Sequence, residues 1–383
     1  MKVSAKAGGR LPDPAGREYD AAMRRNPDLA ENQEQATETA QERHALSAAQ
    51  LADVSRQASE LMERLAAVPQ GDLVAEMIET SLKLLRDRTN RGDLKLINKS
   101  IKEIRYALKV FAPYQHTRKV SIFGSARTPE NDPDYEQAVR FGRKMAQHGW
   151  MVITGAGGGI MAAGHGGAGA DPSFGLAIRL PFEQATNVHI ANDPKLINFK
   201  YFFTRKLMFL RSSHAIALFP GGFGTMDEGF EALTLVQTGK APPMPIVLVD
   251  RPGGNFWKGW MAYVKRHLLG RKFINEEDVH LVRITDDVDE AVEHTVRFYS
   301  NYHSLRYARD ELVLRVQRGP TPAQLQRLND DFADLVEGRI RAGGPLAVEK
   351  DEPSLAHLPR LVMKFNRRDF ARLRAMIDRV NDF

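Results

Sequence analysis

Apolar positions in the first third of the chain recur at helical spacing. Residues 1–70 are rich in Ala, Gln, Glu and Arg, and the polar first part of this extension predicts a loose or disordered start. Residues 72–88 and 97–114 carry apolar side chains three and four positions apart, which predicts two amphipathic helices. We therefore expect a polar, loosely helical extension over residues 1–70 and a helical pair over 71–114.

A different pattern begins at Lys119, where short β-branched runs alternate with helical stretches. Strands are expected within the segments 174–181, 244–250 and 280–285. Three longer segments, 119–127, 150–170 and 214–239, are each expected to begin with a strand. Helices are expected over residues 135–149, 196–213 and 256–270 and at the ends of 150–170 and 214–239. This alternation predicts an α/β fold over residues 115–305, a doubly wound Rossmann-like parallel sheet with helices on both faces.

The last segment, residues 306–383, predicts a small α+β appendage. Its pattern indicates helices over 321–339 and 367–382 and strands over 344–352 and 360–366. One side of the last helix carries Phe370, Leu373, Ile377 and Val380. An apolar stripe with an Arg-rich far face is the ordinary design of a surface helix, so we favour packing over nucleic-acid binding for this helix.

Composition narrows the function classes. The 383 residues include 54 Lys and Arg against 48 Asp and Glu, and the slight excess of +6 indicates a solvated surface more than a nucleic-acid partner. Cysteine is absent, which excludes a disulfide framework, a thiolate zinc site and a cysteine nucleophile. The N-terminus has no apolar signal segment, and no apolar run approaches the ~18 residues that span a membrane. We therefore expect a cytoplasmic protein without a membrane partner.

Three of the predicted strands end in loops of small residues, at 124–127, 155–164 and 220–225. In an open α/β sheet, ligands bind at the carboxyl ends of the strands. Glycine leaves room for a ligand against the backbone, and a loop that opens a helix directs N–H groups at an anion. One such loop is explained by a tight turn alone, but three at one edge predict a ligand that bears phosphate.

The loops do not match the common nucleotide motifs. Residues 220–228 lack the Lys-Ser/Thr ending of a P-loop. Gly157, Gly159 and Ala162 fit the loose dinucleotide pattern, but no acidic residue ends the following strand, where Arg179 stands instead. A dinucleotide stays open but is not favoured, and we predict no cofactor. We also predict no metal, because His165 and His189 lack a second ligand at metal spacing.

Two acids follow the third loop directly. Thr225 and Glu228 form the T-x-x-E pattern of a capping box, in which the threonine caps a helix and the acid reaches back to it. The helix dipole at that position lowers a carboxylate pKa, so we expect Glu228 to be ionised at neutral pH. An ionised acid repels a phosphate placed too close, which indicates that it faces a cationic or hydroxyl-rich part of the ligand.

The stretch PGGFGTMDE (220–228) resembles the PGGxGTxxE motif of the LOG family, the cytokinin-activating phosphoribohydrolases that are often mislabelled lysine decarboxylases. The family places an Arg-Lys pair fifteen residues before the proline, where this chain has Arg205 and Lys206. Residues 124–127, 154–168 and 236–240 resemble further family segments. The resemblance covers residues 119–300, so the chain is similar to a longer bacterial member.

The resemblance implies that the protein hydrolyses the N-glycosidic bond of nucleoside 5′-monophosphates of the purine, AMP-like or cytokinin type. Glu228 then stabilises the oxocarbenium-like state and orients or deprotonates water, and Arg205 positions the substrate. Lys206 is the weaker candidate, with a solvated neighbour as the alternative. The phosphate cradle is formed by Gly222, Phe223, Gly224 and Thr225.

Further expectations follow from the same resemblance. Asp227 is a candidate for ribose contacts, and Thr234 matches a family ligand contact, although a packed helix threonine explains it equally well. The glycine loops add candidate contacts at Gly124, Ser125, Gly157, Gly158 and Gly221. The family pairs subunits, so we expect a homodimer or larger oligomer. The alternative function is a carrier or sensor that binds a nucleotide without turnover.

Overall fold

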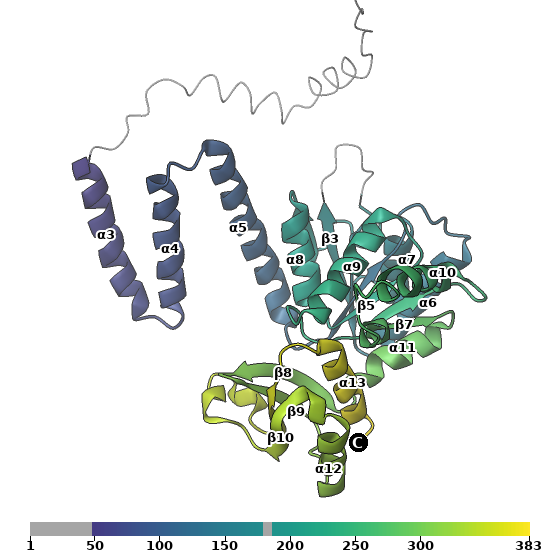
Figure 1. Cartoon of the computed structure of the whole chain (residues 1–383). Helices are drawn as coiled ribbons and strands as arrows, with labels where there is room; N and C mark the ends of the chain where they lie inside the picture. Colours follow the sequence, from purple (N-terminus) through teal and green to yellow (C-terminus); the bar gives the residue numbers. More distant parts are fainter. Residues whose placement is uncertain (1–47, 179–185) are drawn as a thin grey trace, which may run out of the picture. The chain divides into compact units, whose positions relative to one another are not determined.

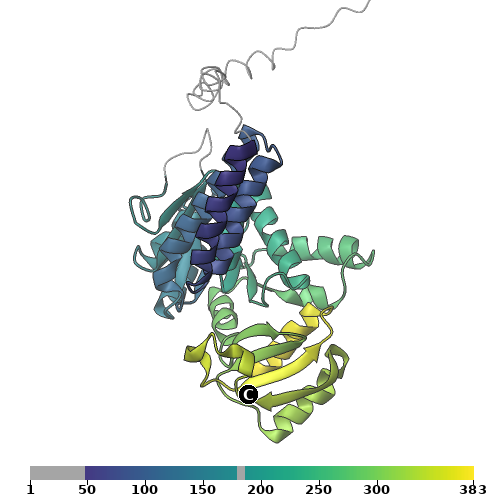
Figure 2. The same cartoon turned by 90° about the vertical axis from the view of Figure 1, so that its left-hand side faces the viewer.

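The computed structural model describes residues 48–178 and 186–383, so the predicted loose start over the first 47 residues lies outside the described part. The chain divides into two compact units, Met1–Leu94 and Lys95–Phe383. In the first unit, α3 (Ala48–Ala66) and α4 (Gly71–Arg86) lie side by side as a helical hairpin (Figures 1 and 2). The next helix, α5 (Arg91–Phe111), belongs to the second unit from Lys95 onward. Both helices expected over 71–114 are therefore present.

Within the described residues, the second unit contains a parallel sheet of seven strands in the order β4-β3-β2-β1-β5-β6-β7. The strands are β1 (Lys119–Phe123), β2 (Met151–Thr154), β3 (Ser173–Ile178), β4 (Leu196–Phe199), β5 (Ala215–Leu218), β6 (Ile246–Val249) and β7 (Val282–Thr285). The central strands are buried along their length, as expected where helices cover both faces. This arrangement confirms the predicted Rossmann-like fold class.

Helices cover both faces of the sheet (Figure 1). Each face forms its own hydrophobic core with the helices that pack on it. One face packs against α6 (Pro133–Gln147), α7 (Ile160–Ala168) and α11 (Val288–Arg297). The other packs against α5, α8 (Phe202–Ser212), α9 (Phe223–Gln237) and α10 (Phe256–Tyr263), which continues as a π-helical segment over Val264–Leu269. The chain changes direction across the sheet between β1 and β5, where Phe123 pairs with Leu218. The loops that follow these strands therefore start side by side, at the point where doubly wound folds bind ligands.

The helix expected over residues 196–213 is wrong in its first part. Leu196–Phe199 form β4, which pairs with Gly175–Ile178 at the edge of the sheet, and α8 begins only at Phe202. The alternation of buried and exposed side chains along β4 is that of a strand at the sheet edge. The sequence pattern does not show this short strand, because its apolar positions run directly into those of the helix.

The appendage is an antiparallel sheet of four strands in the described part of the chain, in the order β10-β11-β9-β8 (Figure 2). Its elements are β8 (Tyr302–Ala308), β9 (Glu311–Val316), α12 (Pro322–Asp331), β10 (Val336–Gly343), β11 (Arg360–Phe365) and α13 (Phe370–Asn381). The expected apolar side of α13 is buried in the core of this sheet. The hairpin of β8 and β9 was not predicted. The helix expected over residues 321–339 is wrong in its last part, because α12 ends at Asp331 and β10 begins at Val336.

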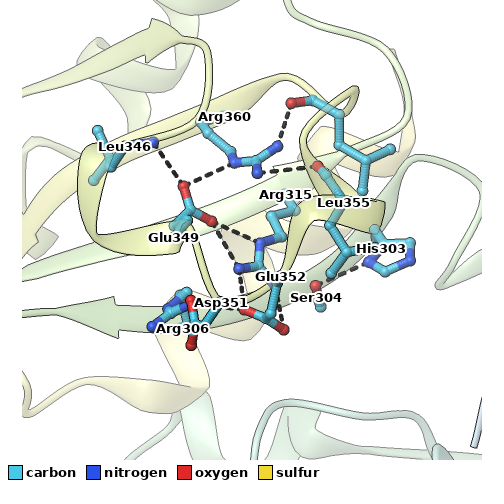
Figure 3. A network of polar contacts seen from close by, with 11 residues as sticks. His303, Ser304, Arg306, Arg315, Leu346, Glu349, Asp351, Glu352, Leu355 and Arg360 are labelled. Carbon is cyan, nitrogen blue, oxygen red and sulfur yellow. Dashed lines mark hydrogen bonds and ion pairs between the residues drawn. The ribbon is translucent and has the colours of Figure 1, made fainter.

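The strand expected over residues 344–352 is wrong, because this segment turns through a short 3-10 helix, Ala347–Glu349. The segment is fixed by a side chain instead of a strand ladder. Figure 3 shows Glu349 accepting hydrogen bonds from Arg315, Arg360 and the Leu346 N–H.

No helix in residues 48–178 and 186–383 has the length and apolar character needed to cross a bilayer.

Candidate active site

The three glycine loops are joined at Ser125. Its N–H donates to the Pro220 carbonyl (3.1 Å), and its own carbonyl accepts from the Ile160 N–H (3.0 Å) at the start of α7. Its hydroxyl accepts from the Arg127 N–H (3.1 Å). The ends of β1, β2 and β5 are therefore held together by backbone contacts, as the sequence predicts for one sheet edge.

The glycines of these loops fall into two groups. A Cβ on Gly221 would lie 2.1 Å from the Thr225 hydroxyl, and one on Gly159, whose φ is +58°, would lie 2.2 Å from the Ser125 carbonyl. Close packing explains these two glycines. A Cβ on Gly222 or Gly224 would meet nothing within 4 Å among the described residues. Packing therefore does not explain the second pair, and both line a cavity.

That cavity has a volume of about 620 Å³ and lies over the joined loops. Of the residues expected in a site, it is lined by Gly124, Ser125, Arg205, Gly222, Phe223, Gly224, Thr225 and Glu228. The expected residues outside the lining are Gly157, Gly158, Lys206, Gly221, Asp227 and Thr234. The sequence-derived set thus divides into a group around the cavity and a group behind or beside it.

Glu228 and Arg205 meet in the cavity from α9 and α8. The carboxylate Oε1 lies 3.9 Å from the Arg205 Nη2, and the Lys206 Nζ lies 3.7 Å from Oε2. Glu228 is only 6% exposed. Its burial raises the pKa of the carboxyl to about 7, although the charges of Lys206 and Arg205 act to lower it.

The expectation that the helix dipole keeps Glu228 ionised is therefore wrong. In the structure α9 begins at Phe223 with Gly222 at its N-cap, so Glu228 lies beyond the first turn, where the dipole effect has faded. Burial outweighs the two cations, and the carboxyl changes its charge near neutral pH.

The capping box is wrong for the same reason. Within the described residues, no side chain caps α9 at Gly222, and Thr225 is already the third helical residue. Its hydroxyl lies close to Gly221, and the residue lines the cavity. The first N–H groups of α9 are therefore not used by the pair that the sequence suggested, and they are placed as a helix N-terminus that attracts anions.

Lys206 is not the solvated neighbour considered from the sequence, because its side chain is only 13% exposed. Its ammonium contacts Asp227 at 2.9 Å and Glu231 at 2.5 Å. Burial lowers the pKa of Lys206, but hydrogen bonds to the two acids and the charge of Glu228 outweigh it and raise that pKa. Asp227 is occupied by Lys206 and does not line the cavity, so the structure does not bring it to the ligand space.

Thr234 is also not brought to this cavity. Its hydroxyl donates to the Phe230 carbonyl (2.8 Å), and the residue lines a separate apolar cavity of about 180 Å³. The alternative interpretation, a threonine that packs on its own helix, therefore describes the contacts of Thr234. His165 is a core residue, since it lies within hydrogen-bond distance of the Phe174 carbonyl (3.0 Å) and burial lowers its pKa to about 4.

The structure adds lining residues that the sequence analysis missed. Arg127 lies exposed at the cavity, two residues beyond Ser125, and its position in a strand-end loop was a signal that could have been used. An apolar wall is formed by Phe123, Met161, Ile178, Phe202 and Phe209. These side chains come from β1, α7, β3 and α8, so no single local sequence pattern predicts the wall.

Comparisons with known proteins agree with the resemblance. The family model described as "Possible lysine decarboxylase" matches residues 157–295. A "Cytokinin riboside 5'-monophosphate phosphoribohydrolase" of Mycobacterium tuberculosis is 28% identical over 169 residues, which are 44% of this chain and 88% of that protein. Together these matches confirm the resemblance to the LOG family.

Solved structures with a similar fold include molybdenum cofactor carrier or binding proteins. The carrier protein from Chlamydomonas reinhardtii is 21% identical, with a TM-score of 0.33, and the match covers 46% of this chain and 94% of that one. The binding protein from Rippkaea orientalis is 20% identical, with a TM-score of 0.32 over 46% and 94% of the two chains. Likenesses at this level do not indicate a ligand for this chain.

Proposed function

We propose that the LOG-family domain of this chain hydrolyses the N-glycosidic bond of a nucleoside 5′-monophosphate and releases the free base and ribose 5-phosphate. The observation that supports this most is Glu228, a buried carboxyl with a pKa of about 7, placed 3.9 Å from Arg205 in a cavity lined by glycine loops. A general base works best when its pKa lies near the working pH. The relative from Mycobacterium tuberculosis, named for this class of reaction, adds support.

The reaction assigns a task to each part of the site. The ionised form of Glu228 takes a proton from water, and the water oxygen forms a bond to C1′ of the ribose. The bond between C1′ and the base nitrogen breaks through an oxocarbenium-like state, which the carboxylate stabilises. The bonding electrons leave with the base, which gains a proton. Arg205 orients the substrate and stabilises the leaving base.

The phosphate is assigned to the start of α9. Gly222 and Gly224 leave the backbone open toward the cavity, and the helix N-terminus favours an anion. The Thr225 hydroxyl and the exposed Arg127 guanidinium add a donor and a charge at the same cavity. The base is assigned to the apolar wall that includes Met161, Phe202 and Phe209, whose rings and thioether suit stacking. Purine monophosphates, including those of the cytokinin type, fit this division of the cavity.

The test is to incubate the full chain with AMP and a panel of other monophosphates and to measure free base and ribose 5-phosphate. We expect release of base, and Glu228→Ala should lower kcat by about 10²- to 10⁴-fold while monophosphate binding persists. Glu290→Ala is the matched control, because it removes a carboxylate that Arg283 and Thr285 contact on α11, away from the cavity. We expect the control to keep its turnover.

Two results would contradict the proposal. Binding of several monophosphates without release of any base would favour the carrier or sensor function. A fully active Glu228→Ala variant would show that the assigned mechanism is wrong, whatever the substrate.

We also propose that the protein self-associates. The family resemblance implies paired subunits, and α8 and α9 expose Phe202, Phe203, Leu207 and Phe223, the last at 96%. Exposed apolar side chains gathered near a site are typical of contact surfaces. Light scattering on the full chain should give the mass of a dimer or larger oligomer, and a monomer across the working concentrations would contradict this expectation.

A further inference from the structure

A carboxylate from a distant part of the chain contacts the start of the helix that carries Arg205. Among the described residues, α8 has no side-chain cap at its own N-cap, Tyr201. The Glu103 carboxylate, on α5, accepts hydrogen bonds from the Lys200 N–H (2.8 Å) and the Thr204 hydroxyl (2.7 Å). Helix α5 lies beside α8 (Figure 1). The acid therefore binds one backbone donor just before α8 and one side-chain donor in its first turn, and its negative charge lies near the positive end of the helix dipole.

These contacts are buried. Glu103 is 4% exposed and Thr204 is fully buried. Lys99, one turn earlier on α5, lies 3.8 Å from the carboxylate. A buried carboxylate is costly unless its oxygens accept hydrogen bonds, so the Lys200 N–H just before α8 and the Thr204 hydroxyl in α8 are the contacts that stabilise it here. Simple filling of the core does not require a carboxylate here.

The packing of α5 fixes Glu103 to the domain. Ala107 and Phe111, farther along the same helix, belong to the core that also holds Phe209 of α8. The Phe111 ring stacks on Phe174 of β3 with centroids 4.4 Å apart. Helix α5 thus has two kinds of contact with the α/β domain, an apolar one through Ala107 and Phe111 and a polar one through Glu103.

Thr204 directly precedes Arg205, so a shift at the start of α8 moves the guanidinium. Arg205 lies against the rings of Phe202 and Phe209, and its Nη2 lies 3.9 Å from Glu228. We propose that Glu103 is a positioning residue, which acts through Lys200 and Thr204 to set the place of Arg205 against Glu228. This inference rests on the proposed function, and it makes α5 part of the catalytic domain instead of an accessory segment.

The experiment uses the full chain with Glu103→Gln and Thr204→Val, each of which removes part of the contact. The first readout is the titration of the Glu228 carboxyl by NMR with ¹³C-labelled glutamate, which requires no substrate. The charged groups that face Glu228 are Arg205 and Lys206 on α8 and Asp227 and Glu231 on α9. Displacement of Arg205 removes a cation from Glu228, so both variants should raise the pKa of Glu228.

The direction in which the pKa of Glu228 changes distinguishes displacement of Arg205 from the direct effect of the lost Glu103 charge. Loss of the negative charge of Glu103 by itself would lower the pKa of Glu228, since it removes a distant like charge, whereas Thr204→Val changes no charge. The second readout is steady-state turnover of AMP. We expect kcat to fall about 10- to 100-fold with a smaller change in KM, because misplacing a reacting group by about 1 Å is sufficient for such a loss.

Two further variants complete the design. Thr204→Ser keeps the hydroxyl and should restore both the titration and the turnover. Phe141→Leu is the packing control, on α6 in the core of the opposite sheet face, and it should lower the thermal stability without moving the titration of Glu228. An unchanged titration and kcat in Glu103→Gln and Thr204→Val would overturn the proposal. If the wild type cleaves no monophosphate, the proposed function fails, and the titration alone still decides the positioning role.

Discussion

Two buried glutamates show how differently this protein treats the same side chain. Glu228, in the candidate active site, and Glu349, in the appendage, are 6% and 5% exposed, and each faces two cations. The pKa of Glu228 is raised to about 7, whereas that of Glu349 is lowered to about 2. Burial alone does not decide the charge of either group.

The difference lies in the contacts of the two carboxylates. Burial raises the pKa of Glu349 too, but hydrogen bonds from Arg360, the Leu346 N–H and Arg315 outweigh it. Those donors lie 2.7–3.1 Å from the Glu349 oxygens. The dashed lines in Figure 3 mark these contacts. At Glu228 the cations lie 3.7 and 3.9 Å away, beyond hydrogen-bond distance. Donors in direct contact fix the charge of one acid, and more distant cations leave the other able to exchange a proton.

This comparison indicates two uses of a buried acid. Glu349 holds the turn over residues 344–352 against the appendage sheet, and a fixed charge serves that purpose. Glu228 lines a cavity, where a carboxyl with a pKa near 7 suits the proton transfer that we propose for it. The variants below test whether the stability effects follow the same division.

The larger effect on stability is expected at Glu349. Glu349→Gln leaves the buried guanidinium groups of Arg315 and Arg360 without their shared charge, so the free energy of unfolding should fall by about 3–5 kcal/mol. Urea unfolding at neutral pH measures this loss. The control is Glu337→Gln, which breaks the exposed pair with Lys364 on the same sheet and should cost less than about 1 kcal/mol. Equal losses in the two variants would contradict the fixed-charge role.

The pH dependence of this effect has a definite sign. The folded pKa of Glu349, about 2, lies below its ordinary value of 4.5, so its stabilisation is present above about pH 4.5 and is lost as the pH falls toward 2. The gap between wild type and Glu349→Gln should therefore narrow in acid.

A smaller effect of opposite sign is expected at Glu228. Its folded pKa, about 7, lies above 4.5, so the folded state binds the proton more tightly and stability is lost as the pH rises from about 4.5 to 7. Glu228→Gln should therefore raise the free energy of unfolding at pH 8 by on the order of 2–3 kcal/mol, with little gain at pH 4.5. Urea unfolding at both pH values measures the difference. A variant that is less stable than wild type at pH 8 would show that the ionised acid supports the fold.

The sequence predicted much of the fold because its signals are local. The motif at residues 220–228 and the strand–helix alternation placed the glycine loops at one sheet edge, and the structure joins them at Ser125. The errors arose where neighbours outside the local pattern decided the outcome. Leu196–Phe199 became an edge strand because β3 offered a partner, and residues 344–352 became a turn because two buried arginines hold Glu349.

The candidate site was predicted in part for the same reason. Arg205 and Glu228 came from the motif and its spacing, but the apolar wall and Arg127 did not, since they join the cavity from separate elements. Thr234 matched a pattern, yet its side chain lies at another cavity. A helix has several faces, and residue spacing alone did not show which face meets the ligand space.

The amino-acid sequence by itself determined the parallel sheet and the order of its loops, because periodicity is carried by neighbouring residues, and the family motif with its spacing pointed to Arg205 and Glu228 as the proposed pair. Only the tertiary structure raised the pKa of Glu228 and brought Glu103 to Lys200 and Thr204, which lie 97 and 101 positions later in the chain. Burial and contacts between distant segments exist only after the chain has folded, so the raised pKa of Glu228 and the contacts of Glu103 could not be predicted from local patterns.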